Sequence, residues 1–229
     1  MSERVARGTG EPHLAEKVYN KLCQDLQDGL YAPGAKLILR DVAAEFGASL
    51  TPVRDALNRL VGERVLEMGS NRTISVPIPL AAEVREIRRI RMELEGFAAA
   101  EAASKGSAGE FADIRVDCDA YAHARRAGDA RRMLEANRDF HFKVYAAARM
   151  PFLLEMIKGL WLRNGPLQYL LSRSATAPLE RSDDHHGAVM RALDERDPEA
   201  ARQGIRNDID YATNDIILAL AELREKSLA

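Results

Sequence analysis

The character of the sequence changes at the stretch VPIPL, residues 76–80. After it, apolar residues recur at helical spacing almost to the end of the chain, and short breaks rich in Gly, Pro and Ser divide them into segments. None of these segments alternates as a β-strand would. The predicted helices lie near residues 81–104, 108–126, 129–148, 151–173, 178–195 and 198–226. We therefore expect residues 79–229 to form an all-α bundle of about six helices, which makes the chain mainly α.

The stretch before this bundle begins with a different pattern. Residues 1–12 are polar and irregular, which predicts a flexible arm. From Leu14 to Leu30 a leucine or valine then recurs every four positions, with charged residues between, as an amphipathic helix requires. The following Pro-Gly pair predicts a turn that ends this helix.

Two more short helices and a hairpin follow. The first of these helices ends at a glycine, and Ser49 or Thr51 can cap the second. Two β-favouring runs, Val65–Met68 and Thr73–Val76, flank the turn GSNR and predict a hairpin, or wing. Residues 13–78 therefore have the outline of a winged helix-turn-helix domain.

Composition limits what such a chain can be. A hydrophobic share of 46% over 229 residues is enough for one large domain or two smaller ones. Cys23 and Cys118 form no C-x-x-C motif, which indicates a reducing cytosol. With no run of about 18 apolar residues and no signal segment, we expect a cytoplasmic protein without a membrane span. Residues 1–76 hold ten basic and ten acidic side chains, so DNA binding has to rest on the placement of particular residues.

The second helix of a helix-turn-helix enters the major groove with its N-terminal turns, where long polar side chains reach base edges. Here Thr51, Arg54 and Asn58 fall on the polar face of that helix, and Arg40 begins the helix before it. An arginine can bind two acceptors of guanine, and a threonine can contact phosphate or a thymine methyl. The same polar face also fits a small domain whose charges only face water. The predicted DNA contacts are Arg40, Ser49, Thr51, Pro52, Arg54, Asn58, Asn71 and Arg72.

The run YAPGAKLILRDVAAEFGASLTPVRDALNRL, residues 31–60, resembles the N-terminal domain of GntR-family transcriptional regulators. That family's pattern is Ser-Arg-Thr-Pro-Val-Arg-Glu-Ala-Leu, and seven of its nine positions match. In the family, the arginine before the second helix, the arginines of the recognition helix and the wing contact operator DNA. Leu50 replaces the first recognition arginine, Arg64 replaces a helix-ending glycine and Thr73 replaces a wing glycine. Because Leu50 cannot bond guanine, which removes about 1–3 kcal/mol of discrimination, we expect an operator that differs at the bases it faces.

Four residues in the second half suggest a metal site. Asn137 and His141 are four positions apart and share a helix face, while His186 and Asp208 lie on later helices. These segments resemble the FCD ligand-binding domain of the FadR-like branch, in which an aspartate and three histidines bind a divalent metal. Asn137 takes the place of the aspartate and Asp208 that of the last histidine. The resemblance implies Zn²⁺, with Ni²⁺ or Mn²⁺ as other candidates, and open positions for a carboxylate. The alternative is a metal-free pocket in which the same residues bind an organic acid directly.

The effector site is expected nearby. Arg91 and Glu95 match an Arg-x-x-x-Glu pattern in the first helix of the FCD domain. An arginine there can bind the carboxylate of an effector, or it can form a salt bridge with Glu95 or another acid. Further polar residues in otherwise apolar helices are predicted pocket walls, namely Asn164, Tyr169, Arg173 and Asn207.

Together these features predict a bacterial transcriptional regulator rather than an enzyme. Its winged domains would bind a palindromic operator in double-stranded DNA as a homodimer, because one recognition helix covers only a half-site. Its helical domain would sense a small organic acid and change operator affinity, with repression as the family's default. Two other classes stay open: a metal-dependent hydrolase using His141, His186 and Asp208 to activate water, and a helical adaptor that does not bind DNA.

Overall fold

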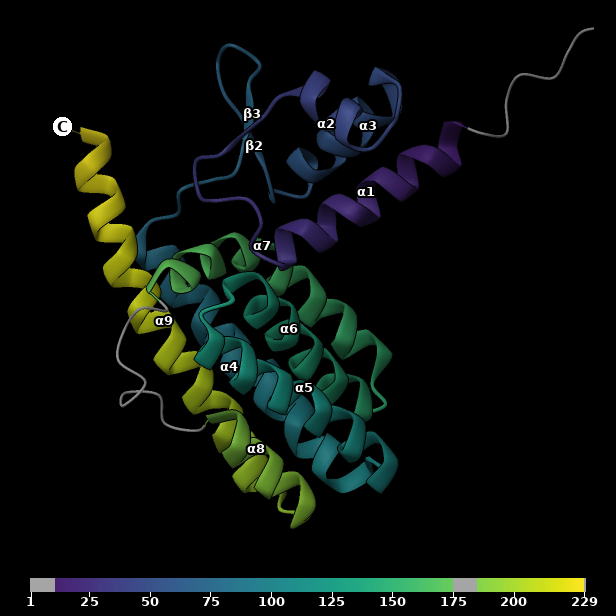
Figure 1. The fold of residues 1–229 in the computed structure, drawn as a ribbon, viewed down its shortest axis with the longest axis vertical. Coiled ribbons are helices and arrows are strands. Elements are labelled where there is room, and N and C mark those ends of the chain that lie inside the picture. The colour runs from purple at the N-terminus through teal and green to yellow at the C-terminus, as the bar shows by residue number, and fades with distance from the viewer. Residues whose placement is uncertain (1–10, 175–184, 229) are drawn as a thin grey trace, which may run out of the picture.

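The computed structural model describes residues 11–174 and 185–228. Most of the predicted arm over residues 1–12, and the predicted start of a helix near residue 178, lie outside this part of the chain. A winged domain sits at one end of the molecule and a bundle of long helices at the other (Figure 1). The elements in chain order are α1 Glu11–Gln27, β1 Lys36–Leu37, α2 Leu39–Glu45, α3 Leu50–Gly62, β2 Glu67–Met68, β3 Ile74–Ser75, α4 Ala81–Lys105, α5 Ala108–Ala127, α6 Ala130–Ala147, α7 Pro151–Ser174, α8 His185–Asp194 and α9 Pro198–Leu228.

The winged domain is built around the apolar stripe of α1. Leu22 and Leu26 are fully buried in its core, as their spacing predicts. The spacing fails at Leu30, which is 42% exposed. The physical reason is that α1 ends at Gln27 and Gly29 adopts a left-handed φ of +63°, so the chain has turned away before Leu30.

The wing carries one strand more than the sequence predicts. β2 and β3 pair antiparallel as a hairpin, and β1 pairs with the other side of β3, giving the sheet order β1-β3-β2. In β1, Lys36 lies opposite Ser75 and Leu37 lies opposite Ile74. A strand of two residues has no alternation to detect in the sequence, so only its pairing reveals it.

Six helices, α4 to α9, make up the helical domain within the described residues, which confirms the all-α prediction. The longest two, α4 and α9, lie side by side (Figure 1). Ala98, Ala99, Ala102 and Ala103 are buried along α4, and their small side chains let neighbouring helices approach closely. No described helix is both long and apolar enough to cross a membrane.

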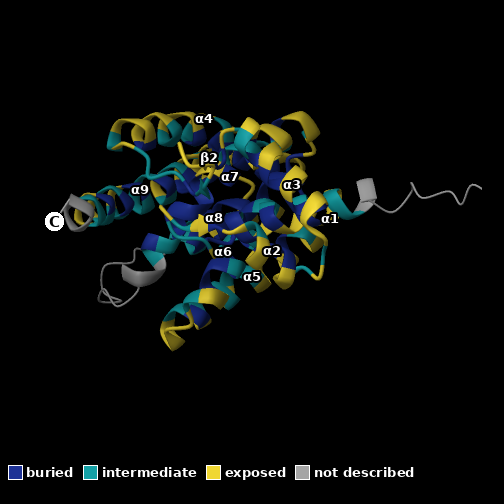
Figure 2. Ribbon diagram, turned by 90° about the horizontal axis from the view of Figure 1, so that it is seen from above, coloured by how far each residue is buried: buried dark blue, intermediate teal, exposed yellow. Residues whose placement is uncertain are grey.

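The two domains meet along α7. Leu162 of this helix is part of the apolar core of the winged domain. A side chain at Gly165 would collide with the backbone of Leu26 in α1, so the two helices touch without room for a Cβ atom. Arg163 donates from Nη2 to the backbone oxygen of Glu63 at 2.8 Å. Seen from above, buried residues lie toward the middle of the molecule and exposed residues on its outer faces (Figure 2).

Candidate DNA-binding face and buried polar site

The outward face of α3 carries polar side chains that are exposed to solvent. Thr51, Arg54 and Asn58 are exposed on it. Within the described chain, Arg54 forms no hydrogen bond or ion pair, so its guanidinium is available to a base edge or a phosphate. Ser49 is the exposed N-cap residue of α3, and its side chain makes no capping bond. Pro52, also a predicted DNA contact, is buried, so it shapes the first turn of α3 and does not face outward.

The wing faces α3 across a cavity of about 530 Å³. Arg54 and Asn58 line it from the helix, and Arg72 and Thr73 line it from the wing. The remaining lining is apolar and consists of Leu37, Ile38, Leu39, Leu57, Met68 and Ile74. The structure thus brings polar side chains of the helix and the wing to one face of the domain. Arg40 and Asn71 are also exposed, although the side-chain oxygen of Asn71 accepts a bond from the Thr73 amide at 3.1 Å.

The departures from the family pattern have visible consequences. Leu50 is the first residue of α3 and is 41% exposed. Arg64, in the place of a glycine, has a φ of 57°. A left-handed backbone costs a residue with a side chain about 1–2 kcal/mol, so this position still has the geometry that favours glycine. The wing residue Arg72 also has a positive φ, 61°, whereas Thr73 does not.

Arg59 lies on the outer side of α3 but is committed to contacts within the domain. Its guanidinium forms ion pairs with Glu16 at 2.9 Å and with Glu63 at 3.0 Å. It also lies 3.6 Å from the centre of the Tyr19 ring. Arg59 therefore ties α3 to α1, and Arg54 is the arginine of α3 that is free to meet DNA.

The helical domain encloses a second polar group of residues. His141 of α6, His186 of α8 and Asp208 of α9 meet so closely that one potential ligand atom from each lies within 4.8 Å of the others. The Nε2 atom of His141 is 3.2 Å from Oδ2 of Asp208, and Nε2 of His186 is 3.7 Å from its Oδ1. Asn137, the fourth predicted ligand, is half-buried one turn before His141 on α6. The consecutive helices α8 and α9 and the earlier helix α6 thus place two imidazoles around one carboxylate.

The surroundings of these residues favour the charged form of Asp208. Burial alone raises the pKa of its carboxyl group, but the hydrogen bond from His141 and the charges of His186, His141 and His185 outweigh that effect. The pKa of Asp208 therefore lies well below its ordinary value. The ring of Phe140 stacks on His186 with centroids 4.2 Å apart, which excludes water from that side.

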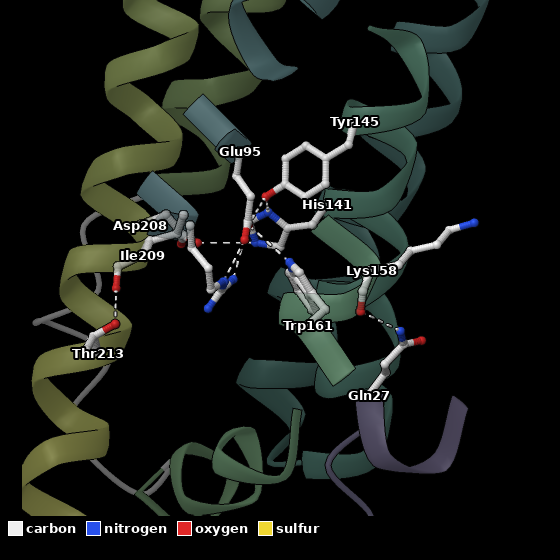
Figure 3. A network of polar contacts seen from close by, with 10 residues as sticks. Gln27, Glu95, His141, Tyr145, Lys158, Trp161, Asp208, Ile209 and Thr213 are labelled. Atoms are coloured by element: carbon white, nitrogen blue, oxygen red, sulfur yellow. Dashed lines mark hydrogen bonds and ion pairs between the residues drawn. The ribbon is translucent and has the colours of Figure 1, made fainter. Parts of the chain in front are cut away.

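Next to this group, the buried carboxylate of Glu95 on α4 accepts four hydrogen bonds from three residues (Figure 3). Arg91 donates from Nε to Oε1 at 2.6 Å and from Nη2 to Oε2 at 3.2 Å. The Tyr145 hydroxyl and the Trp161 indole donate to Oε2 at 2.6 and 3.1 Å. The same hydroxyl lies 3.0 Å from Nδ1 of His141. The sequence left open whether Arg91 binds an effector carboxylate, Glu95 or another acid. In the structure its partner is Glu95.

Three buried side chains with polar atoms in the helical domain were not predicted: Tyr145 and Trp161, which donate to Glu95, and Gln168. Tyr145 follows His141 by four positions, so a search along that helix face would have found it. Trp161 and Gln168 lie on α7 among apolar residues and have no comparable signal. An aromatic side chain in an apolar helix is expected in the core whether or not it binds a polar partner.

The predicted effector residues lie in different surroundings. Asn164 is only 4% exposed, and its Nδ2 atom has no hydrogen-bond partner among the described residues. Tyr169 is half-buried in a smaller apolar cluster. Asn207 is exposed and accepts a bond from Gln203 at 2.7 Å, so it does not face the interior. The side chain of Arg173 lies outside the described part of the structure.

A winged helix-turn-helix presents its second helix to the major groove of DNA, so the fold indicates a DNA-binding regulator. Comparison with known families gives the same class. Residues 14–76 match the family described as bacterial regulatory proteins, gntR family, and residues 86–211 match the FCD domain. The chain belongs to the GntR family of transcriptional regulators, in the branch that carries an FCD domain.

Individual relatives support this assignment. The HTH-type transcriptional regulator McbR of Escherichia coli K12 is 35% identical over 199 residues, which cover 85% of this chain and 90% of that protein. Its solved structure has a TM-score of 0.79 with 31% identity and covers 92% of this chain and 98% of that chain. A probable D-xylose utilization operon transcriptional repressor of Paenarthrobacter nicotinovorans is 27% identical and covers 91% of this chain and 89% of that protein. These relatives are transcriptional regulators, and the class of metal-dependent hydrolases has no counterpart among them.

Proposed function

We propose that this regulator is a homodimeric repressor of the cytoplasm that binds a palindromic operator and responds to a small organic acid. A divalent metal held by His141, His186 and Asp208, with Asn137 as a further ligand, would form part of the effector site. The observation that carries the proposal is the convergence of two imidazoles and one carboxylate from three helices inside the FCD domain. Residues 13–78 would supply the DNA-binding part and residues 79–229 the sensing and dimerising part.

The donor atoms fit a metal of the zinc type. Bonds of about 2.0–2.2 Å to nitrogen and oxygen put neighbouring ligand atoms roughly 3–3.5 Å apart around one Zn²⁺ ion. The 3.2 Å between His141 Nε2 and Asp208 Oδ2 falls in this range, and the 3.7 Å from His186 needs only a small rotation. Zn²⁺, Ni²⁺ and Mn²⁺ all accept such mixed nitrogen and oxygen ligands.

The charges in the interior favour an anionic effector. Arg91 and Glu95 neutralise each other, so Asp208 supplies one negative charge when both imidazoles are neutral. A divalent cation would then leave one positive charge in a buried site, which a carboxylate compensates. The Nδ2 atom of Asn164 has no hydrogen-bond partner among the described residues, so it is a further donor that an oxygen-rich ligand could satisfy.

On the DNA side, Arg40 and Arg54 are the exposed cations best suited to contact the duplex. Neither forms an ion pair within the described chain. One α3 helix reads only a half-site, so two copies of the chain are needed for a palindrome with half-sites about one helical turn apart. The operator would differ from the common one at the bases that Leu50 faces.

The metal can be tested on full-length protein purified without a histidine tag. We expect about one zinc, nickel or manganese ion per chain by elemental analysis, as a single three-helix site predicts. His141→Ala should lose the metal, whereas His123→Ala should keep it, because His123 is exposed on α5. Wild-type protein without stoichiometric metal would refute this part of the proposal.

The DNA contact can be tested by a gel shift with the DNA upstream of the protein's own gene. We expect a dimeric complex whose affinity falls steeply as salt rises, since phosphate contacts release counterions. Binding that ignores salt, or a one-to-one complex with a single half-site, would contradict the proposal. Organic acids can then be screened by thermal shift and by their effect on the complex.

A further inference from the structure

We infer that Arg91, Glu95 and Tyr145 are positioning residues for His141 and do not themselves bind the effector. They form a buried chain of contacts that runs from the guanidinium of Arg91 through Glu95 and Tyr145 to Nδ1 of His141. Figure 3 labels Glu95, Tyr145 and His141 along this chain. This chain sets the tautomer of His141: it places the ring hydrogen on Nδ1 and leaves Nε2, which faces Asp208, able to bind a metal. The inference rests on the proposed metal site.

Glu95 is already bound by four donors of the protein, three at Oε2 and one at Oε1. A carboxylate offers about four lone-pair positions. Glu95 accepts two bonds from Arg91 and one each from Tyr145 and Trp161. All four residues of this group are nearly or fully inaccessible to solvent, so an effector that displaced one bond would leave a buried donor unsatisfied. We therefore expect that an effector does not bind directly to Arg91 or Glu95.

The hydroxyl proton of Tyr145 determines the tautomer of His141. The oxygens of Tyr145 and Glu95 are 2.6 Å apart, which is the distance of a charge-assisted bond with the phenol proton between them. With its one proton given to Glu95, Tyr145 can only accept a bond from His141, whose Nδ1 lies 3.0 Å away. His141 must then carry hydrogen on Nδ1. When His141 gives up the Nε2 hydrogen that bonds Asp208, the neutral ring turns its Nε2 lone pair toward the Asp208 side, where a metal would lie.

This is the arrangement that a metal-binding histidine requires. The nitrogen that does not bind the metal donates to an oxygen acceptor, which sets the tautomer and the ring orientation. Here the acceptor is the phenol oxygen of Tyr145. Its hydroxyl is bonded to the carboxylate of Glu95, whose charge Arg91 neutralises. Trp161 supports the same group from α7, because its indole donates to Glu95 and its ring lies 5.3 Å from that of His141.

The inference can be tested with Tyr145→Phe in the full-length protein. This substitution keeps the ring and removes only the hydroxyl. We expect its zinc affinity, measured by competition with a chromogenic chelator, to fall about 10- to 100-fold. The matched control is Tyr121→Phe, since the Tyr121 ring lies 4.4 Å from the His186 ring but its hydroxyl forms no hydrogen bond to His141 within the described chain. The control should bind zinc as the wild type does.

A second measurement reports the tautomer directly. In zinc-loaded wild-type protein labelled with ¹⁵N-histidine, we expect His141 to be protonated at Nδ1 and coordinated through Nε2. In Tyr145→Phe that single form should be lost, a change that a purely structural role of the hydroxyl would not produce. Coordination of the wild-type ring through Nδ1 would overturn the inference, even if Tyr145→Phe did not fold.

The outcomes separate this inference from the proposed function. A wild-type protein that binds no zinc overturns both. A wild-type protein that binds zinc, together with Tyr145→Phe of equal affinity, overturns only the positioning role. An equal loss in Tyr145→Phe and Tyr121→Phe also overturns it, because the hydroxyl bonded to His141 would then have no special effect.

Discussion

On the α3 face of the winged domain a charged side chain is exposed and unpaired among the described residues, whereas in the interior of the helical domain charged side chains are buried and paired. On the face of α3, Arg54 is exposed and makes no ion pair within the described chain. In the interior of the helical domain, Arg91 is 4% exposed and bound to Glu95 at both carboxylate oxygens. An exposed arginine is solvated by water and can pair with the phosphates of DNA. A buried arginine needs a counter-ion from the protein itself, because an unpaired buried charge is costly.

This difference shows what each region can recognise. The DNA-binding face obtains its complementary charges from the duplex, so its residues need only be displayed at the right spacing. An interior site for the proposed ion and effector would have to hold its side chains in place before either arrived, because rearranging buried charges is costly. The helix α7 touches both regions, with Trp161 facing Glu95 and Leu162 in the core of the winged domain.

The largest effect should come from breaking the interior site. Glu95→Ala leaves the Arg91 guanidinium and the donors of Tyr145 and Trp161 buried without their acceptor. We expect a loss of about 3–5 kcal/mol in the free energy of unfolding, measured by urea denaturation. Glu93→Ala is the control, because Glu93 is a largely exposed partner of Arg206 and such pairs contribute about 0–1 kcal/mol. Equal losses in the two variants would show that the buried Arg91–Glu95 pair stabilises the fold no more than an exposed pair does.

The next effect concerns the exposed face. Arg54→Ala should weaken binding to an operator obtained by in vitro selection from random duplexes by about 1–3 kcal/mol, and should relax its sequence preference. Arg59→Ala should keep the sequence preference, since that side chain is bound to Glu16 and Glu63. Fluorescence anisotropy on matched and mismatched duplexes measures both. If Arg59→Ala relaxed the preference and Arg54→Ala did not, the roles assigned to these two arginines would be reversed.

An effect of similar size, on stability instead of DNA binding, is expected where the two regions join. Gly165→Ala places a methyl group against the backbone of Leu26, which cannot move aside as a side chain can. We expect a destabilisation of about 1–3 kcal/mol and faster proteolysis in the stretch of residues 76–80. Gly159→Ala on the same helix is the control, because its added Cβ would meet only the end of Arg163 at 3.9 Å. That variant should be as stable as the wild type or more so.

The smallest effect tests a departure from the family pattern. Arg64→Gly removes a side chain from a residue with a φ of 57° and should raise the free energy of unfolding by about 0.5–1 kcal/mol. Arg64→Ala keeps the unfavourable backbone and should give no such gain. A loss of stability in Arg64→Gly would mean that the arginine side chain stabilises the winged domain more than its backbone conformation costs.

Much of the fold follows from local patterns. The predicted helix over residues 108–126 corresponds to α5, Ala108–Ala127, and that over residues 129–148 to α6, Ala130–Ala147. These limits could be predicted because caps and helical periodicity are properties of neighbouring residues. The strand β1 could not, since its two residues are a strand only through their pairing with β3.

The residues of the candidate sites divide in the same way. Arg54, His141 and His186 stand out in the sequence because their residue types and the pattern around them resemble a known family. That Pro52 is buried, that Asn207 faces outward and that Leu30 is exposed depend on where each helix ends and which side is covered.

By itself, the sequence determined the order of the helices, the winged helix-turn-helix and the residue types available for DNA and metal. Only the tertiary structure decided the partner of Arg91 and the contacts of Tyr145. The contacts that matter there join Glu95 to residues 50 and 66 positions later in the chain. A helix pattern reports which side of a segment is apolar, but the direction of a buried proton depends on atoms that only folding brings within 3 Å or so of one another.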